Sequence, residues 1–264
     1  MTIATSPARQ LCALATAALL LGLSMPVAAG ILTRIDEGHY RNTGESPVTS
    51  NTYLGREITS TFQEVRSFLL FDLSGLSAPV ASAALHLELN AYFGSLPSMS
   101  FTIHDVTTDP DALVAPHASG SAQGLAIYAD LGSGTVYGAG TAIPALAAHR
   151  CLSDFTCTGT NQDAGQVLAL QLNAAALADI NARLGGRFAV GFSLDDTGPN
   201  GAVFNSALKG IRFRADFGET RIPVADLVLQ SAPVPEPGSL SMVALAALGL
   251  VIRSIRAEAR RGRA

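Results

Sequence analysis

Alternating apolar and polar residues run through the middle of the chain. In residues 83–92, AALHLELNAY, the leucines fall on one side of an extended backbone, and His86, Glu88, Asn90 and Tyr92 fall on the other. This period of two predicts a strand with one buried face. The same alternation recurs in residues 65–73, 101–103, 125–131, 168–172, 188–194, 211–215 and 227–229. Repeated strands separated by Gly, Pro, Asn and Ser predict an all-β sandwich.

One segment follows a helical period instead. In AAALADINARL, the side chains of Leu177, Ile180 and Leu184 share one face of a helix. Asn173 stands where an N-terminal cap is expected, and Gly185 provides a C-terminal stop. We therefore expect one short helix, which packs over one end of the sandwich.

Residues 1–29 have the order of a secretory signal peptide. Arg9 is the only charged residue, Leu11–Leu23 form an apolar run, and Val27–Ala29 offer small residues for cleavage before Gly30. The alternative is a buried N-terminal helix. The tripartite order favours export, and the apolar run is short for a membrane span.

The chain ends in a proline hinge, an apolar segment and a basic tail. Prolines at positions 233, 235 and 237 favour an extended spacer after a sandwich domain of residues 30–232. Residues 239–252 carry no charge, and as a helix they span about 21 Å against about 30 Å for a hydrocarbon core. Arginine side chains behind them can reach the interface, so we predict a transmembrane helix over residues 239–252. The basic tail holds Arg253, Arg256, Arg260, Arg261 and Arg263.

This C-terminal arrangement resembles the PEP-CTERM sorting signal. The motif residues are Val234, Pro235, Glu236 and Pro237, followed by the apolar helix and the arginines as a cytoplasmic stop. In that family the signal is carried by exported proteins of Gram-negative bacteria that make extracellular polysaccharide, and an exosortase is thought to process it at the inner membrane. The resemblance covers residues 233–264 and implies an exosortase and the inner membrane as partners of the tail.

The middle of the chain is similar in pattern to jelly-roll domains of the DNRLRE or disaggregatase-related type. The similarity rests on RSFLLFDLSGLSAPVASAALHLELN, with Arg66 before a buried strand and Phe-Asp-Leu at Phe71–Leu73, and on AALADINARLGGRFAVGFSLDD. Such domains occur on bacterial surface proteins and beside carbohydrate-active modules. The similarity implies a jelly-roll sandwich between the signal peptide and the transmembrane helix, but a shared fold does not determine an activity.

Charge is divided unevenly between the middle and the end of the chain. Residues 30–233 hold 19 acidic and 11 basic residues, a net charge of −8, whereas residues 253–264 have a net charge of +4. The acidic middle disfavours nucleic acid as a partner. A basic cluster confined to the far side of an apolar run is typical of a cytoplasmic flank.

Two cysteines remain once the predicted signal peptide, which contains Cys12, is removed. Cys151 and Cys157 have five residues between them in HRCLSDFTCTG. An exported chain meets an oxidising compartment, which favours a disulfide between these cysteines over two free thiols. The closed loop is short, so the stabilising effect of the disulfide is expected to be small.

No catalytic motif stands out. The five histidines never form His-Glu-x-x-His, and no Gly-x-Ser-x-Gly elbow or phosphate-binding glycine loop occurs. Carboxylates for glycoside hydrolysis need a spatial separation that a sequence does not show. Tryptophan is absent, and for the five tyrosines burial is favoured over stacking against a sugar.

Two acidic segments supply candidate calcium ligands. HDVTTDPDAL holds Asp105, Asp109 and Asp111, and LDDTGPNGA holds Asp195 and Asp196 next to Asn200. Calcium binds carboxylate and carbonyl oxygens, which sandwich loops often supply. Local hydrogen bonds within turns are the favoured alternative. We expect no cofactor other than such structural calcium.

These features predict an exported, non-enzymatic protein of the cell surface or extracellular matrix. We expect it to be held at the inner membrane during sorting, and its sandwich is a candidate binder of exopolysaccharide. The alternative is a secreted carbohydrate-active enzyme, a glycoside hydrolase or lyase, with carboxylates on the loops of a jelly-roll scaffold. The residues do not identify the polymer.

Overall fold

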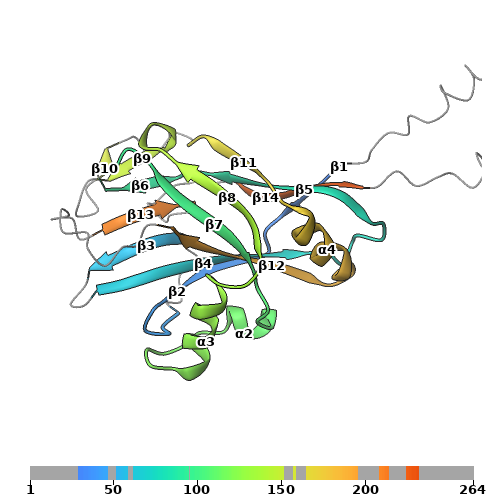
Figure 1. Cartoon of the computed structure of the whole chain (residues 1–264), viewed down its shortest axis with the longest axis horizontal. Coiled ribbons are helices and arrows are strands. Elements are labelled where there is room, and N and C mark those ends of the chain that lie inside the picture. Colours follow the sequence, from blue (N-terminus) through green and yellow to red (C-terminus); the bar gives the residue numbers. More distant parts are fainter. Residues whose placement is uncertain are drawn as a thin grey trace, which may run out of the picture. The chain divides into compact units, whose positions relative to one another are not determined.

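The computed structural model describes residues 29–46, 52–58, 62–94, 96–151, 157–158, 165–195, 208–213 and 224–231. Within them the chain forms two packed β-sheets, which we call sheet A and sheet B (Figure 1). The all-β sandwich predicted from the alternating pattern is confirmed. Sheet A is antiparallel, in the order β1 (Ala29–Thr33), β14 (Ala225–Ser231), β5 (Val80–Glu88) and β11 (Val167–Gln171).

Sheet B is larger, with ten strands among the described residues. Its order is β10 (Cys157–Thr158), β9 (His149–Cys151), β6 (Ala91–Phe93), β13 (Leu208–Arg212), β3 (Tyr53–Ile58), β4 (Phe62–Asp72), β12 (Arg187–Leu194), β7 (Met99–Asp105) and β8 (Val136–Ala142). The remaining strand, β2 (Asp36–Arg41), pairs with β4. The pair β6 and β9 is parallel, whereas β4 pairs antiparallel with each of its neighbours.

Eight of these strands form a set that alternates between the two sheets along the chain. In chain order they are β1, β4, β5, β7, β8, β11, β12 and β14. Numbered one to eight, they lie in the order one, eight, three, six in sheet A and two, seven, four, five in sheet B. Every connection in this set except β7 to β8 therefore crosses from one sheet to the other, and sheet A is not complete until the last strand, β14, has been added.

The main core lies between the two sheets. Phe71 on β4 stands opposite Phe188 on β12, and both side chains are fully buried. Two residues further along each strand, Leu69 and Val190 repeat this arrangement. Burial of alternate residues on paired strands is what the period of two predicts.

Residues 83–92 are not one strand, which corrects the sequence prediction. They are divided between β5 in sheet A and β6 in sheet B, with Leu89 and Asn90 at the crossing. Glu88, Asn90 and Tyr92, which were predicted to face outward, are at most 1% exposed. Apolar and polar residues continue to alternate through a corner where the chain passes from one sheet to the other. The period of two in the sequence therefore does not show where the corner lies.

The predicted helix is present as α4 (Ala174–Ala182). Asn173 caps it, and its Oδ1 accepts the N–H groups of Ala175 and Ala176 at 3.0 and 3.2 Å. Ile180 is buried in the main core. The helix covers one end of the sandwich beside β5 and β8 (Figure 1).

The prediction of a single short helix is wrong. Helices α2 (Pro110–Val114) and α3 (Ala122–Asp130) lie between β7 and β8, and a 3-10 turn, η1, covers Pro144–Leu146. Residues 125–131, predicted as a strand, form the greater part of α3 and its C-cap.

The spacing of buried residues explains why this segment is helical. Ile127 and Leu131, four positions apart, are buried, whereas Leu125 is 41% exposed. That spacing places the two buried side chains on one face of a helix. Ser121 caps the helix, since its hydroxyl accepts the N–H of Gly124 at 3.2 Å.

Helices α2 and α3 cover the outer face of sheet B and bury a second cluster, which we call the outer core. Tyr40 on β2 anchors it by donating a hydrogen bond to the carbonyl oxygen of Leu113 at 2.8 Å. The outer core contains Tyr40, Phe68, Leu70, Val106, Leu113, Ile127, Leu131 and Ala189.

The described domain begins and ends on neighbouring strands. Strands β1 and β14 lie side by side (Figure 1), and Ala29 pairs with Gln230 in their register. The predicted signal peptide up to residue 28 and the whole predicted sorting signal, including the helix over residues 239–252, lie outside the described residues. No described helix has the length and apolar character needed to cross a membrane.

Candidate functional site

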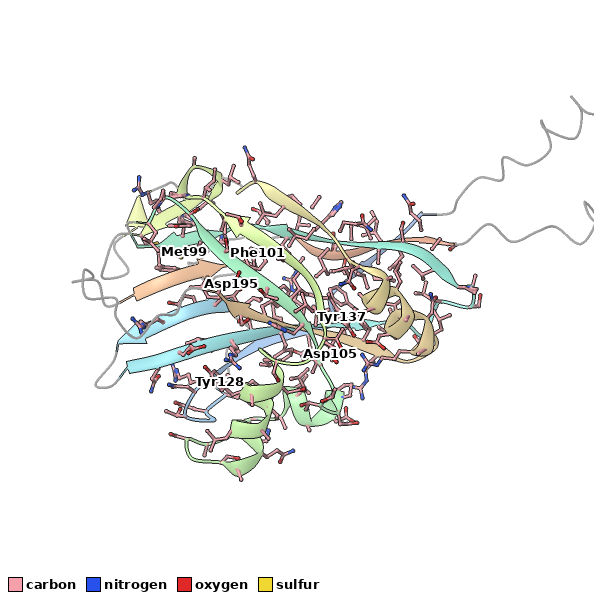
Figure 2. All side chains as sticks on the ribbon, viewed as in Figure 1. Met99, Phe101, Asp105, Tyr128, Tyr137 and Asp195 are labelled. Atoms are coloured by element: carbon pink, nitrogen blue, oxygen red, sulfur yellow. The ribbon has the colours of Figure 1, made fainter. Side chains whose placement is uncertain are left out.

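Asp105 and Asp195, two of the candidate calcium ligands, are labelled in Figure 2, and both accept hydrogen bonds from other protein groups. Asp105 Oδ1 accepts the backbone N–H of Thr135 at 2.7 Å, and Asp195 Oδ1 accepts the hydroxyl of Thr102 at 2.6 Å. Asp196, like Asn200, lies outside the described residues. Both partners are distant in the sequence, so these two carboxylates join separate segments of the fold and do not make the local turn bonds that the alternative interpretation expects.

Asp109 and Asp111 belong to the start of α2. Asp109 Oδ1 accepts the N–H groups of Asp111 and Ala112 at 2.9 and 3.4 Å, while Asp111 Oδ1 lies 2.9 Å from Arg187 Nη1. In the described part of the chain, no three side chains of His, Cys, Asp or Glu come together as a metal site. The calcium hypothesis gains no support from these residues.

Cys151 is disulfide-bonded. It ends β9, is fully buried, and stands opposite Cys157 in the register of β9 and β10. Residues directly opposite each other on antiparallel strands are close enough for a disulfide. The register is thus compatible with the Cys151–Cys157 pairing predicted from the sequence.

The tyrosines do not offer an open platform for a sugar ring. Tyr128 is half-buried, and the guanidinium carbon of Arg66 lies 4.3 Å from the centre of its ring. Burial raises the pKa of Tyr40 and of Tyr92 to about 12. The tyrosines that are at most 1% exposed are Tyr40, Tyr53, Tyr92 and Tyr137.

A serine–histidine pair lies on the outer face of sheet B. His104 Nε2 is 3.0 Å from Ser193 Oγ, and burial lowers the pKa of His104. A nucleophilic serine needs a base that a third group orients. His104 Nδ1 is buried and receives no hydrogen bond from the described residues. Asp105 and Asp195 are bonded elsewhere, so the pair does not form a triad.

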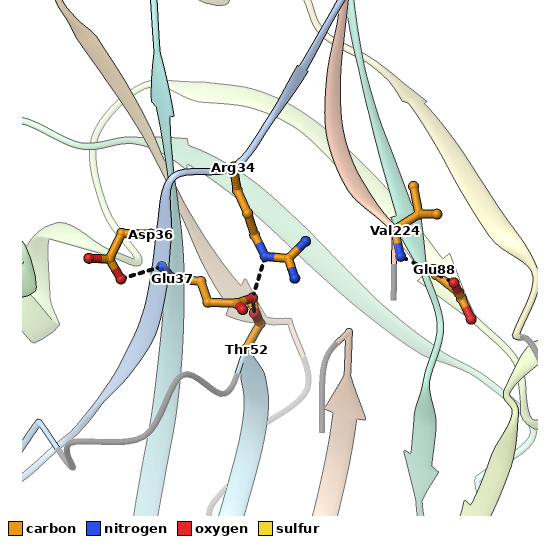
Figure 3. A network of polar contacts seen from close by, with 6 residues as sticks. All are labelled: Arg34, Asp36, Glu37, Thr52, Glu88 and Val224. Atoms are coloured by element: carbon orange, nitrogen blue, oxygen red, sulfur yellow. Dashed lines mark hydrogen bonds and ion pairs between the residues drawn. The ribbon is translucent and has the colours of Figure 1, made fainter. Parts of the chain in front are cut away.

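A buried ion pair connects the two sheets near the start of the domain (Figure 3). Arg34 Nε lies 3.0 Å from Glu37 Oε2, and the same oxygen accepts the hydroxyl of Thr52 at 2.6 Å. The side chains of Arg34 and Glu37 are 5% and 2% exposed. Arg34 follows β1 of sheet A and Glu37 belongs to β2 of sheet B, so the ion pair fixes the passage from one sheet to the other.

Glu88 supports the corner between β5 and β6 (Figure 3). Its two carboxylate oxygens accept the backbone N–H groups of Gly165 and Val224 at 3.0 and 3.1 Å. These bonds satisfy donors in the segments that lead into β11 and β14. Glu88 is therefore a structural carboxylate, as are Asp105 and Asp109.

A pocket of about 270 Å³ opens between the start of α2, the turn after α4 and the first residues of β12. It combines charged groups of both signs with small apolar residues, and we call it the arginine pocket. It is lined by Val106, Thr107, Thr108, Asp109, Pro110, Arg183, Arg187 and Ala189.

The turn after α4 brings two arginines to this pocket. In Arg183-Leu184-Gly185-Gly186-Arg187, Gly185 has a φ of +79°, a conformation that glycine adopts without strain. The N–H of Gly186 donates to the carbonyl oxygen of Arg183 at 3.0 Å, which closes the turn. The glycine stop was predicted from the sequence, but the arginines on either side of it were not predicted as site residues. Two arginines flanking a glycine turn are the sequence feature that could have indicated this site.

Both guanidinium groups are held by other pocket elements. Arg183 Nη2 donates to the carbonyl oxygen of Val106 at 3.4 Å. The pKa of Arg187 is raised, first by its hydrogen bond to Asp111 and further by the charges of Asp109 and Asp72. Arg187 thus stays charged among several carboxylates.

The opposite wall of the pocket is fixed by one carboxylate of α3. Asp130 accepts the hydroxyls of Thr107 and Thr108 at 2.8 and 2.7 Å, and their backbone N–H groups at 3.0 and 2.8 Å. These four bonds hold the Thr107–Thr108 loop in one conformation. The pocket is therefore formed before any ligand arrives.

A scan against protein-family models finds no match for this chain, and a search of curated proteins finds none either.

Proposed function

We propose that this chain is an exported, non-enzymatic protein of the cell surface or extracellular matrix, sorted through a PEP-CTERM-like tail and able to bind extracellular polysaccharide. The observation that carries the proposal is the position of the described domain between the two end segments. Its first strand, β1, begins at Ala29 and its last strand, β14, ends at Ser231, close to the predicted limits of residues 30 and 232. Removal of both end segments therefore takes only Ala29 from the described strands.

We further propose that the sandwich is a jelly roll. The strand orders one, eight, three, six and two, seven, four, five are those of a double Greek key closed into two sheets. Strands β2, β3, β6, β9, β10 and β13 extend sheet B beyond this framework. Since jelly rolls serve many functions, this assignment supports a surface role only together with the end segments.

Substitution of the sorting motif tests the export route. With Pro235, Glu236 and Pro237 replaced by alanine, we expect the chain to accumulate in the inner membrane, because the processing enzyme no longer recognises it. Pro233→Ala, next to the motif, serves as the matched control and should be sorted normally. Membrane fractionation followed by immunoblotting measures the result, and equal surface yield from both variants would contradict the proposal.

The enzymatic alternative is distinguished by its products. We expect the protein recovered from the culture to leave the host polysaccharide intact, with no new reducing ends and no unsaturated sugars. New reducing ends would indicate a glycoside hydrolase, and absorbance from unsaturated uronic acids would indicate a lyase. Either result would replace the non-enzymatic proposal.

A further inference from the structure

The arginine pocket offers hydrogen-bond donors and acceptors side by side. A guanidinium carries five N–H donors in a planar fork, and Arg187 meets Asp111 through Nη1. Both capping bonds of Asp109 fall on Oδ1, so its Oδ2 accepts no hydrogen bond from the described residues. A ligand that both donates and accepts hydrogen bonds over a short distance fits this combination.

The charges around Arg187 favour an uncharged ligand. Asp111 Oδ1 lies 2.9 Å from Arg187 Nη1, Asp72 stands opposite Arg187 in the register of β4 and β12, and Asp109 lines the same pocket. An anionic ligand would have to displace Asp111 and approach the other two carboxylates, within a domain of net charge −8. Hydroxyl groups meet no such repulsion.

Apolar atoms complete the pocket. Val106 and Ala189 are 2% and 3% exposed and belong to the outer core, and Pro110 lies beside them in the lining. Pro110, which is partly exposed, supplies C–H surface that suits the C–H face of a sugar ring. The Asp130 contacts keep the opposite wall rigid, so little entropy is lost on binding.

We propose that the arginine pocket binds one uncharged sugar unit of a polysaccharide, with Arg183 and Arg187 donating to adjacent hydroxyls, Asp109 accepting from one of them, and Asp111 holding Arg187 in place. This inference rests on the proposed binding of extracellular polysaccharide, and it identifies the ligand class and the site. Sorting through the tail does not depend on it.

Affinity electrophoresis of the full-length chain in mild detergent tests the inference. The neutral probes are dextran, galactomannan and xylan, and the acidic probes are alginate and polygalacturonate. We expect retardation by at least one neutral polymer, unchanged between about 0.05 and about 0.5 M NaCl because no charge is exchanged. Stronger retardation by an acidic polymer that disappears at the higher salt concentration would overturn the inference, as would retardation by none of the five.

Variants locate the site. Arg187→Gln should reduce retardation at least about tenfold, which corresponds to loss of a charge-assisted, fork-shaped contact. Asp111→Asn, at a side chain that is 80% exposed, cannot disturb the core and should reduce retardation severalfold. Arg41→Gln is the matched control, because Arg41 also pairs with a carboxylate, Glu45, at 2.9 Å.

The control site lies far from the pocket. Arg41 pairs with Val65 at one end of β4, and Arg187 pairs with Asp72 at the other, about 23 Å along the strand. We expect Arg41→Gln to bind like the parent chain. Equal retardation of all variants would overturn the pocket assignment while leaving polysaccharide binding elsewhere intact. Failure of the sorting experiment instead would contradict the proposed export route and leave the pocket unaffected.

Discussion

The two apolar cores of this protein differ in how they are built. The main core is enclosed by two sheets whose strands come from the whole length of the described chain, while the outer core lies beneath two short helices from one connection, between β7 and β8. The arginine pocket lies at the edge of the outer core, where Val106 and Ala189 belong to both. The comparison indicates that the sandwich supplies stability and the helical connection supplies a surface for recognition.

The largest expected effects are the losses of unfolding free energy caused by cavity-forming substitutions in the two cores. Phe192→Ala in the main core should lower the free energy of unfolding by about 3–5 kcal/mol, and Ile127→Ala in the outer core by about 2–3 kcal/mol, since the short helix α3, which carries Ile127, can settle into the space. Denaturant titration measures both. If Ile127→Ala costs more than Phe192→Ala, the outer core is not the weaker one.

Next in size is the ion pair between the sheets. Glu37→Gln removes the carboxylate beside a buried guanidinium, Arg34, and should destabilise the domain by about 3 kcal/mol. The control is Glu45→Gln, which breaks the more exposed pair with Arg41 and should cost less than about 1 kcal/mol. Thermal unfolding of both variants gives the comparison. Equal losses would show that the Arg34–Glu37 contact does not hold the sheets together.

The smallest effects concern the helix caps. Asn173→Ala should cost about 1–2 kcal/mol, because Asn173 caps α4 and also donates from Nδ2 to the carbonyl oxygen of Val136 at 2.7 Å. Ser121→Ala, which removes a cap with one side-chain bond on α3, should cost about 0.5–1 kcal/mol. Chemical denaturation resolves the difference. A larger loss for Ser121→Ala would contradict the ranking of the two regions.

Local patterns predicted the sandwich and α4 well, because both depend on residues close in sequence. Leu69 and Phe71 alternate with polar or outer-core residues along one strand, and Asn173 and Gly185 mark the ends of the helix. Helix α3 was missed because LAIYADL satisfies a period of two as well as a helical spacing. The packing of this segment against the outer core is what makes it a helix and not a strand.

The candidate site was harder to predict for a different reason. The sequence motifs favoured acidic groups such as Asp105 and Asp109, whose carboxylates accept backbone N–H groups of the protein itself. The arginine pocket depends on Val106 and on Arg183 and Arg187, which follow it by 77 and 81 residues and meet it only through the packing of α2, α4 and β12. The spacing of these residues in the sequence does not show that they are close together in the folded protein.

Mass spectrometry of the protein isolated from the membrane and extracellular fractions of its host tests the central claim most directly. The account predicts that the extracellular form begins at or next to Gly30 and ends before the apolar segment of residues 239–252, with the complete domain between them. An intact chain of 264 residues found in the cytosol, with both end segments present and no shorter form in any other fraction, would contradict it.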